Sequence, residues 1–361
     1  MMRRLRVLIV DDSVVMRRLV SDMVLSDPEL EVAGVAHHGL IALAKIPQVS
    51  PDIVTLDVDM PEMDGLESLA RIRADYPNLP VIMLSGLTED GAKATIEALA
   101  MGASDYVTKP STIGTSSTSA SEVRDELLKK IKALGSRKLS QRAKSRRSAK
   151  GEPSGQSRLE VVAIGISTGG PNALVQVLPE LPADFPVPVL VVQHMPPLFT
   201  RFLAERLEKL CRLRVREAVQ GERLEPGTIW IAPGDFHMEI ERTDKGAFIR
   251  LHQGPLENSC RPAVDPLFRS AVECFGSRVL GVVMTGMGQD GLQGSRCIHD
   301  AGGQLLAQDQ QTSVIWGMPR FVTEEGLPDA VLPLERLAEA IQQRVAVGRA
   351  AKKPLSVEAK S

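Results

Sequence analysis

Three residue types that act together in acyl transfer each follow an apolar run in the second half of the chain. Ser167 follows VVAIGI, His194 ends VPVLVVQH, and Asp290 follows RVLGVVMTGMGQ. A serine hydroxyl is a weak nucleophile, and a neutral imidazole can take its proton as the hydroxyl attacks a carbonyl. An aspartate can hold that imidazole in the required tautomer. These residues therefore predict nucleophilic hydrolysis of an ester or an amide.

The residues alone leave other assignments open. The segment GISTG around Ser167 matches G-x-S-x-G, but the order Ser, His, Asp differs from the Ser, Asp, His order of α/β-hydrolases. The same segment could bind a phosphate at a helix N-terminus, although it lacks both common nucleotide motifs. Other candidate bases and acids in this half are His237, His252, His299, Asp235 and Asp265. We favour His194 and Asp290 because they follow apolar runs most directly.

Acidic side chains follow the apolar runs of the first half. Asp11 and Asp12 come after RVLIV, and Asp57 ends DIVTLD. Three carboxylates at one edge of a parallel sheet would repel one another unless a cation lay among them, and oxygen ligands suit Mg²⁺. Ser85 and Lys109, which follow the next two runs, could bind an incoming phosphoryl group. The first half therefore predicts a magnesium-dependent phosphorylation site.

Both halves have the pattern of elements that such sites require. Short β-branched runs alternate with amphipathic segments of helix length, which is typical of parallel sheets covered by helices. We expect two doubly wound α/β domains, the first flavodoxin-like and the second Rossmann-like. A hairpin-like stretch, 238–253, interrupts the second domain.

A change in composition divides the chain. The run GSRKLSQRAKSRRSAK contains no acidic residue, and GEPSGQS follows it, so no apolar period supports a core there. The predicted domains are residues 1–134 and 158–348, joined by a basic flexible linker at 135–157. Residues 349–361 form a predicted C-terminal tail.

Composition excludes several classes of protein. The 43 Lys and Arg residues nearly balance the 45 Asp and Glu residues, and aromatic residues make up only 3%, so we expect no nucleic-acid partner. No apolar run of about 18 residues predicts a membrane-spanning segment, and the start lacks the features of a signal peptide. The four cysteines form no CxxC pair. We therefore expect a cytoplasmic protein without membrane insertion.

In combination these motifs resemble those of a known family. The first half, with DDS, DVDMPEMDG and TKP, resembles the receiver domain of two-component response regulators. With GISTGGP, QHMP, RPAVDPLFRSA and TGMGQDG added, nearly the whole chain resembles the CheB family, the chemotaxis response-regulator protein-glutamate methylesterases.

For the first half, the resemblance implies roles for the acids named above. Asp57 would accept the phosphoryl group, Asp12 would bind Mg²⁺ directly, and Asp11 would bind it through water. The Asp57 carboxylate and the carbonyl of Asp59 would be further ligands. The implied switch residues are Ser85, Tyr106 and Lys109.

For the second half, the resemblance implies that Ser167, His194 and Asp290 form a catalytic triad. Thr168 would lie near the nucleophile, and the backbone N–H of Met287 would help to hold the oxyanion. The implied substrates are glutamate methyl esters on chemoreceptor cytoplasmic domains, hydrolysed to glutamate and methanol, and receptor glutamines, deamidated to glutamates. A chemotaxis histidine kinase would be the phosphodonor, and the esterase itself would need no cofactor. Phosphorylation would relieve a block imposed by the receiver.

The sequence departs from the family pattern in two places, and two other functions stay open. Cys260 precedes the Arg261-Pro262 pair, where we expect a histidine or another polar residue, and the linker is long and very basic. The cysteine could alter the substrate rim, and the linker could alter docking to receptors. A phosphorylation-controlled binding module would need no intact triad, and a DNA-binding response regulator would need a helix-turn-helix effector.

Overall fold

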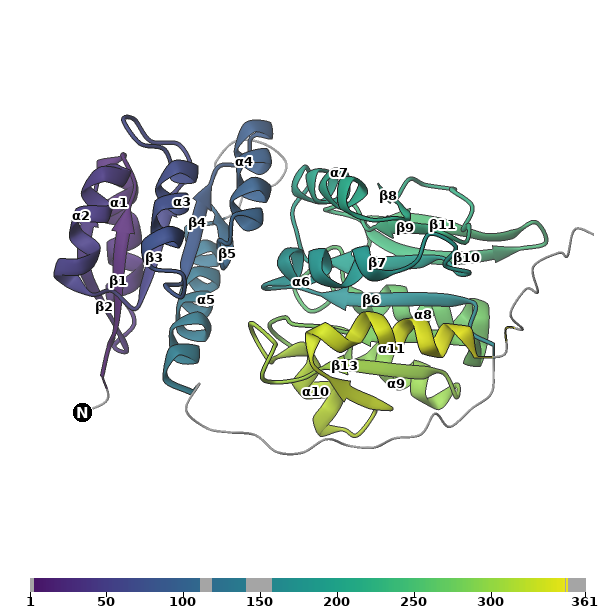
Figure 1. Cartoon of the computed structure of the whole chain (residues 1–361). Coiled ribbons are helices and arrows are strands. Elements are labelled where there is room, and N and C mark those ends of the chain that lie inside the picture. Colours follow the sequence, from purple (N-terminus) through teal and green to yellow (C-terminus); the bar gives the residue numbers. More distant parts are fainter. Residues whose placement is uncertain (1–2, 111–118, 141–157, 348, 350–361) are drawn as a thin grey trace, which may run out of the picture.

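The computed structural model describes residues 3–110, 119–140, 158–347 and 349, which form two α/β domains placed side by side (Figure 1). Residues 141–157 of the predicted linker and nearly all of the predicted tail lie outside the described residues. Within the described ranges, no helix is both long and apolar enough to cross a lipid bilayer.

A five-stranded parallel sheet in the order β2-β1-β3-β4-β5 forms the N-terminal domain. Its strands are β1 (Leu5–Val10), β2 (Leu30–Ala36), β3 (Ile53–Asp57), β4 (Val81–Ser85) and β5 (Asp105–Thr108). Every residue of β3, β4 and β5 is buried, as expected for apolar strands covered on both faces. The strand order is that of flavodoxin-like folds and confirms the predicted fold class.

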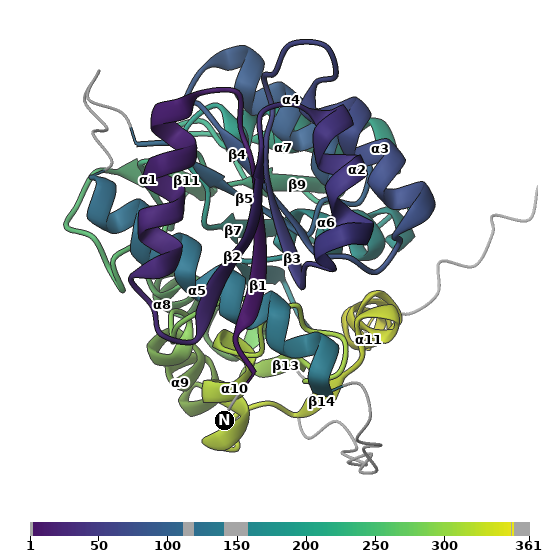
Figure 2. The same ribbon diagram turned by 90° about the vertical axis from the view of Figure 1, so that its left-hand side faces the viewer.

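Five helices cover this sheet, with α1 and α5 on one face and α2, α3 and α4 on the other (Figure 2). They are α1 (Val14–Leu25), α2 (Gly39–Val49), α3 (Gly65–Asp75), α4 (Glu89–Ala100) and α5 (Ala120–Ser140). Side-chain caps fix where several of them begin. Ser13 accepts from the Met16 N–H at α1, and Asp64 accepts from the Glu67 N–H at α3.

The predicted start of the linker at residue 135 is wrong, because α5 continues to Ser140. Lysine and arginine are good helix formers, so the basic composition does not end the helix. Gly135 lies inside α5, where a Cβ atom would approach the Leu5 side chain to 2.8 Å. The glycine therefore allows the helix to pass close to the first strand.

A seven-stranded parallel sheet in the order β14-β13-β12-β6-β7-β9-β8 forms the C-terminal domain. Its strands are β6 (Val161–Ile166), β7 (Val189–Gln193), β8 (Arg214–Glu217), β9 (Thr228–Ile231), β12 (Val279–Val283), β13 (Gln304–Gln308) and β14 (Ala330–Leu332). The predicted hairpin is also present, as β10 (His237–Thr243) paired antiparallel with β11 (Gly246–His252). Strands β8, β13 and β14 were not among the expected strands. Of these, β8 and β14 form the edges of the sheet. Edge strands are often short, and a short strand has too few apolar residues to be predicted from the sequence.

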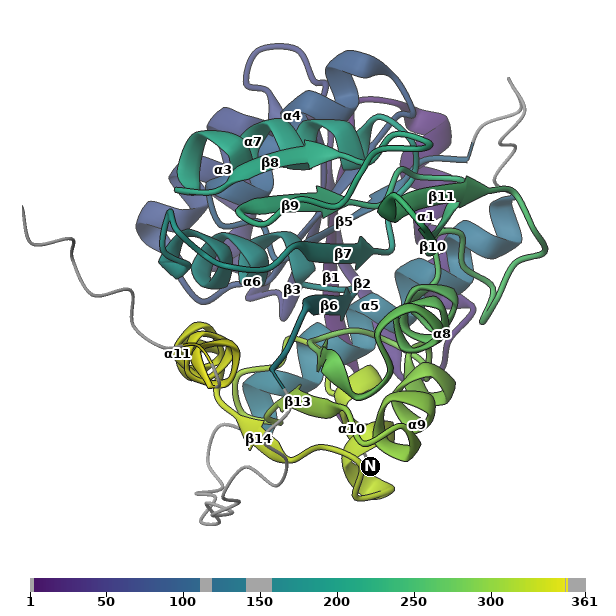
Figure 3. The same ribbon diagram turned by 90° about the vertical axis from the view of Figure 1, so that its right-hand side faces the viewer.

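Helices α6, α7 and α11 cover one face of this sheet, and α8, α9 and α10 cover the other (Figure 3). Their bounds are α6 (Gly170–Val177), α7 (Phe199–Leu210), α8 (Val264–Phe275), α9 (Leu292–Asp300), α10 (Met318–Glu324) and α11 (Leu334–Ala346). Short 3₁₀ turns follow α6 at Leu178–Glu180 and α8 at Gly276–Arg278. Helices on both faces of a parallel sheet confirm the predicted α/β class.

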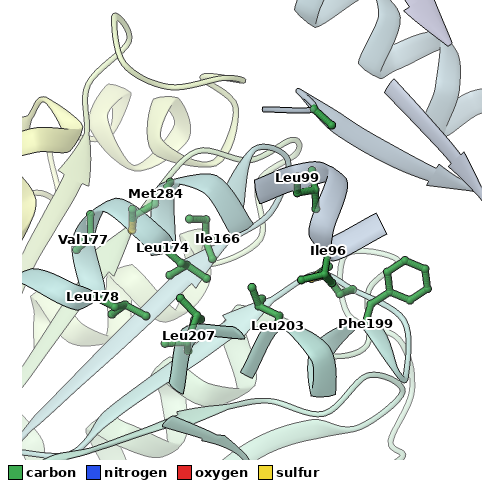
Figure 4. Packing of buried hydrophobic residues seen from close by; sticks show 14 of the residues in the cluster. Ile96, Leu99, Ile166, Leu174, Val177, Leu178, Phe199, Leu203, Leu207 and Met284 are labelled. Carbon is green, nitrogen blue, oxygen red and sulfur yellow. The ribbon is translucent and has the colours of Figure 1, made fainter. Parts of the chain in front are cut away.

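The two domains meet where α4 and β5 pack against α6 and α7. Ile96 and Leu99 of α4 belong to the same buried apolar cluster as Phe199 and Leu203 of α7 (Figure 4). The ring of Tyr106, in β5, stacks on the ring of Phe199 with centroids 4.9 Å apart and an interplanar angle of 13°. Polar contacts between the described residues of the two domains include Arg201 with Glu89 at 2.5 Å, Arg206 with the Ile96 carbonyl at 3.1 Å, and Asn172 with the Ala103 carbonyl at 3.0 Å.

Candidate active site

Three adjacent strands of the C-terminal sheet end at the predicted triad. Ser167 follows β6, His194 follows β7, and Asp290 lies in the loop after β12. Strand β6 is hydrogen-bonded to both β7 and β12. The chain reverses its direction of travel across the sheet at this point, and such reversals open a crevice beyond the carboxyl ends of the strands. The fold therefore places the three side chains at the edge where α/β proteins bind ligands.

A tight turn between β6 and α6 presents Ser167. The Ser167 N–H donates to the Thr285 carbonyl at 3.0 Å, and the Ser167 carbonyl accepts from the Gly170 N–H at 2.7 Å. Gly169 adopts a φ of 75°, which is strained for residues with a Cβ atom. A Cβ atom on Gly286 would lie 2.8 Å from Ser167 Cβ, so glycine is required at this close approach.

Hydrogen bonds hold the histidine and the aspartate together. His194 Nε2 lies 2.7 Å from Asp290 Oδ2, and the His194 N–H donates to the Ile166 carbonyl at 3.2 Å. Gln193, which is buried, donates from Nε2 to the carbonyls of both Ser167 and His194, at 3.0 and 3.2 Å. The backbones carrying the serine and the histidine are thus tied to one another. Gln193 was missed from the sequence, although a polar residue at the end of an apolar strand was a signal for it.

The Asp290 carboxylate accepts several hydrogen bonds besides that of His194. Two come from the first N–H groups of α8, those of Val264 at 2.6 Å and Asp265 at 3.2 Å. Others come from the Gly291 N–H at 2.9 Å and from Asn258 Nδ2 at 3.1 Å. Burial raises the pKa of Asp290, but the bonds from His194 and from α8 lower it below its usual value. The carboxylate is therefore ionised and fixed in orientation.

The His194 ring lies between Asp290 and Cys260. Because Nε2 bonds to Asp290, Nδ1 is the nitrogen that remains to act as a base. The Cys260 Sγ lies 3.5 Å from Nδ1. Burial lowers the pKa of His194, whereas Cys260 and Asp290 raise it, and the resulting pKa is about 10. This environment stabilises the imidazolium that forms when a base takes a proton.

The two residues predicted beside the oxyanion lie in the segments that meet at Ser167. Thr168 is buried, and its carbonyl accepts from Thr285 Oγ1 at 2.9 Å. Met287 follows Gly286, the residue packed against Ser167 Cβ. The loop containing Met287 is also bonded to the start of α10, because the Met318 N–H donates to the Gly286 carbonyl at 2.8 Å.

The alternative bases and acids have other contacts. His237 is buried, with Nε2 2.9 Å from the Pro255 carbonyl and Nδ1 accepting from the Ala263 N–H at 3.2 Å. Asp235 pairs with the Arg261 guanidinium at 2.6 Å. Asp265 accepts from the Gly294 N–H at 2.7 Å and from Asn258 Nδ2 at 3.0 Å, which places it behind Asp290. His237 and Asp235 therefore stabilise loops, whereas Asp265 supports the site indirectly.

The acids of the N-terminal domain also converge. Ligand oxygens of Asp11, Asp12 and Asp57 all lie within 4.8 Å of one another at the carboxyl ends of β1 and β3. Asp11 and Asp57 are buried, whereas Asp12 is exposed. The Oδ2 atom of Asp11 is buried, and its partner is the Lys109 ammonium group at 3.0 Å. A hard divalent cation suits this set of carboxylates, because it takes oxygen ligands and retains water on its open side.

Lys109 lies against the same carboxylates. Its Nζ is 2.7 Å from Asp57 Oδ1 and 3.0 Å from Asp11 Oδ2. Burial raises the pKa of Asp57, Lys109 lowers it, and the resulting pKa is about 6. The N–H of Asp59, whose carbonyl was predicted as a metal ligand, also bonds to the Asp57 carboxylate. The pocket thus holds the Asp57 carboxylate between a lysine and two other acids, of which Asp11 is also buried.

The predicted switch residues link this pocket to the domain interface. Ser85 is buried at the end of β4, and Tyr106 is the ring that stacks on Phe199. A residue missed from the sequence, Lys130 of α5, lies behind that ring. Its Nζ donates to the Tyr106 carbonyl at 2.7 Å and lies 5.1 Å from the ring centroid. The run of charges around Lys130 gave no sign that this lysine would be buried.

Two family profiles match the chain. The CheB methylesterase profile matches residues 162–341, and the response regulator receiver domain profile matches residues 7–117. The first covers the candidate triad, and the second covers the acidic pocket.

Individual proteins match over nearly the whole length. A protein-glutamate methylesterase/protein-glutamine glutaminase of Trichodesmium erythraeum is 51% identical, over 95% of this chain and 100% of that protein. A protein of the same name from Nocardioides is 50% identical, over 95% of this chain and 96% of its own. The crystal structure of the Thermotoga maritima CheB methylesterase catalytic domain is 43% identical and has a TM-score of 0.51, over 51% of this chain and 98% of that domain.

Proposed function

The chain belongs to the CheB family of receiver-linked protein-glutamate methylesterases, and we propose that Ser167, His194 and Asp290 are its catalytic triad. It is a phosphorylation-regulated protein-glutamate methylesterase and protein-glutamine glutaminase. The observation that supports the triad best is the 2.7 Å contact of His194 with Asp290, beside the turn that presents Ser167. The fold brings all three to neighbouring strand ends.

In the first half of the reaction, Ser167 Oγ attacks the ester carbonyl of a glutamate methyl ester. The hydroxyl proton passes to His194 Nδ1, and Asp290 stabilises the imidazolium through Nε2. The Met287 N–H, which follows the Gly286 that packs against Ser167 Cβ, binds the oxyanion of the tetrahedral intermediate. Such a donor typically contributes about 3–4 kcal/mol. When the intermediate collapses, the imidazolium gives its proton to methoxide, and methanol leaves.

In the second half, water hydrolyses the glutamyl ester on Ser167. His194 Nδ1 takes a proton from the water, and the collapse of the second intermediate returns a proton to the serine oxygen. The products are free enzyme and a glutamate side chain. A glutamine side chain follows the same path, except that the first leaving group is ammonia.

In the N-terminal domain, Asp57 is the proposed phosphoryl acceptor. Asp12, Asp11 through water, the Asp57 carboxylate and the Asp59 carbonyl would hold Mg²⁺, which when bound neutralises charge on the phosphoryl oxygens. The Asp57 carboxylate attacks the phosphorus of the donor while the bond from phosphorus to the donor atom breaks, and the donor leaves with that electron pair. Lys109, already 2.7 Å from that carboxylate, then pairs with a phosphoryl oxygen.

The partners follow from the two activities. A receiver domain takes its phosphoryl group from a kinase, and we propose that a chemotaxis histidine kinase is the donor. We propose that the substrates are methylated glutamates and specific glutamines on the cytoplasmic domains of chemoreceptors.

The packing of the two domains supports control of the esterase by the receiver. The stack of Tyr106 on Phe199 and the α4–α7 contact hold the receiver against the helices beside the strand ends. We propose that phosphorylation of Asp57 acts through Ser85 and Tyr106 to weaken this packing. A difference of a few kcal/mol between the packed and open arrangements is enough to gate activity.

One experiment tests whether a single triad performs both reactions. Methanol and ammonia release are measured from receptor cytoplasmic fragments that carry methylated glutamates or unmodified glutamines. We expect Ser167→Ala to abolish both products, while Ser295→Ala, which changes a buried serine of α9, leaves them near the wild-type rates. Loss of only one product in Ser167→Ala would show that the two reactions use different nucleophiles.

A further inference from the structure

The Cys260 thiol faces the imidazole of the proposed triad. Its Sγ lies 3.5 Å from His194 Nδ1, the nitrogen that must accept the serine proton. Asp290 bonds to the other ring nitrogen at 2.7 Å. The ring is therefore held between a carboxylate and a sulfur, and the sulfur occupies the side of the ring at which proton transfer must take place.

A network of hydrogen bonds fixes the position of this thiol. Asn258 and Ser259 adopt φ angles of 50° and 62°, a left-handed conformation that is uncommon for residues with a Cβ atom. Asn258 Nδ2 donates to both Asp290 and Asp265. The Cys260 N–H donates to the Glu257 carbonyl at 2.9 Å, and the reverse bond is 3.2 Å. A strained backbone conformation persists only where the surroundings impose it. The hydrogen bonds of the segment 257–260 therefore fix it next to the triad.

The charges around the ring favour its protonated form. Asp290 faces it from the loop after β12, and Asp265 lies behind Asp290 at the start of α8. Arg261 is the adjacent cation, and its guanidinium is paired with Asp235. Among the described residues, no cation other than His194 itself forms an ion pair with Asp290 to offset its effect. This matches the raised pKa of His194, to which the thiol contributes.

We propose that Cys260 is a positioning residue of the esterase, whose sulfur shares a proton with His194 Nδ1 and holds the imidazole protonated in the resting enzyme. In that state the Nδ1–H of the imidazolium donates to the Cys260 sulfur. Nδ1 must release this proton to water before it can accept the proton of Ser167. The side chain at position 260 therefore sets the pH at which the base becomes available. This inference rests on the proposed role of His194 as the base.

The pH dependence of methanol release tests the inference. The full chain is assayed with a small-molecule phosphodonor and Mg²⁺ as wild type, Cys260→Ala, Cys260→Ser and the control Cys297→Ala, a half-buried cysteine of α9. We expect the acidic limb of the kcat profile to move to lower pH by about one unit in both Cys260 variants, because one acidic partner of the imidazole is removed. Cys297→Ala should keep the wild-type limb. A lower plateau with an unmoved limb in both Cys260 variants would indicate a merely structural thiol and overturn the proposal.

A second measurement does not depend on esterase activity. The ultraviolet absorbance of thiolates is followed against pH in the wild type, Cys260→Ala and His194→Ala. We expect a wild-type step that disappears in Cys260→Ala and moves to higher pH in His194→Ala, because the pair titrates as a unit. A step that is the same with and without His194 would overturn the shared proton. Since this readout needs no substrate, it separates failure of this inference from failure of the proposed triad.

Discussion

Replacing Phe199 by leucine should loosen the receiver from the catalytic domain. Phe199 is fully buried at the start of α7, and its ring stacks on Tyr106 of the receiver at 4.9 Å. Leucine keeps an apolar side chain at this position but removes the aromatic pair. The substitution therefore acts on the interface while leaving both phosphorylation pocket and triad unchanged.

The size of the effect follows from the lost pair. An aromatic pair contributes about 0.5–1.5 kcal/mol beyond the area that it buries, and the smaller leucine also fills the site less well. We expect the packed arrangement to lose about 1–2 kcal/mol relative to the open one, which raises the open population about 5–30-fold. If only the open arrangement is active, methanol release without phosphodonor should rise by the same factor. Stimulation by the phosphodonor should shrink accordingly.

The control is Phe275→Leu, which changes an aromatic residue in a cluster formed entirely by the C-terminal domain. It should lower the free energy of unfolding without raising the basal rate. Both variants are checked for folding by circular dichroism before methanol release from a methylated receptor fragment is measured. A folded Phe199→Leu protein with the wild-type basal rate would refute the idea that this packing blocks the esterase.

Other substitutions separate the receiver from the chemistry. Asp57→Asn should keep the basal esterase rate and lose all stimulation by a phosphodonor; retained stimulation would exclude Asp57 as the acceptor. Chelation of Mg²⁺, or Asp12→Ala, should abolish stimulation in the same assay while the basal rate stays constant, and a fall in the basal rate would instead place a metal in the esterase reaction. Asp290→Asn should lower kcat by about 10⁴-fold because the imidazole loses its orienting carboxylate, and a loss below tenfold would argue against the triad. Asn258→Ala should lower kcat about tenfold, since Asp290 and Asp265 lose a shared donor, and an unchanged kcat would show that this bond does not position the aspartate.

The placement of the triad candidates was predictable because it depends on local patterns. Ser167, His194 and Asp290 each follow a buried apolar run, and parallel strands bring their carboxyl ends to one edge. The same argument located Asp11 and Asp57 in the first domain. In both cases the alternation of strands and helices determined which side chains would meet.

Contacts that depend on loop paths or on packing between domains were not predictable. Cys260 was expected at the substrate rim, but left-handed residues before it turn its thiol toward His194. The stack of Tyr106 on Phe199 joins two domains, and no local pattern reports such a contact. The extension of α5 to Ser140 was hidden by a basic composition that is typical of linkers but equally compatible with a helix.

The most direct test of a phosphorylation-gated serine esterase is methanol release from a methylated receptor cytoplasmic fragment. Wild type and Ser167→Ala are compared, each with and without a small-molecule phosphodonor and Mg²⁺. We predict release by the wild type that rises with the phosphodonor, and no release by Ser167→Ala under either condition. Release that persists without the Ser167 hydroxyl, or that the phosphodonor leaves unchanged in the wild type, would contradict the account.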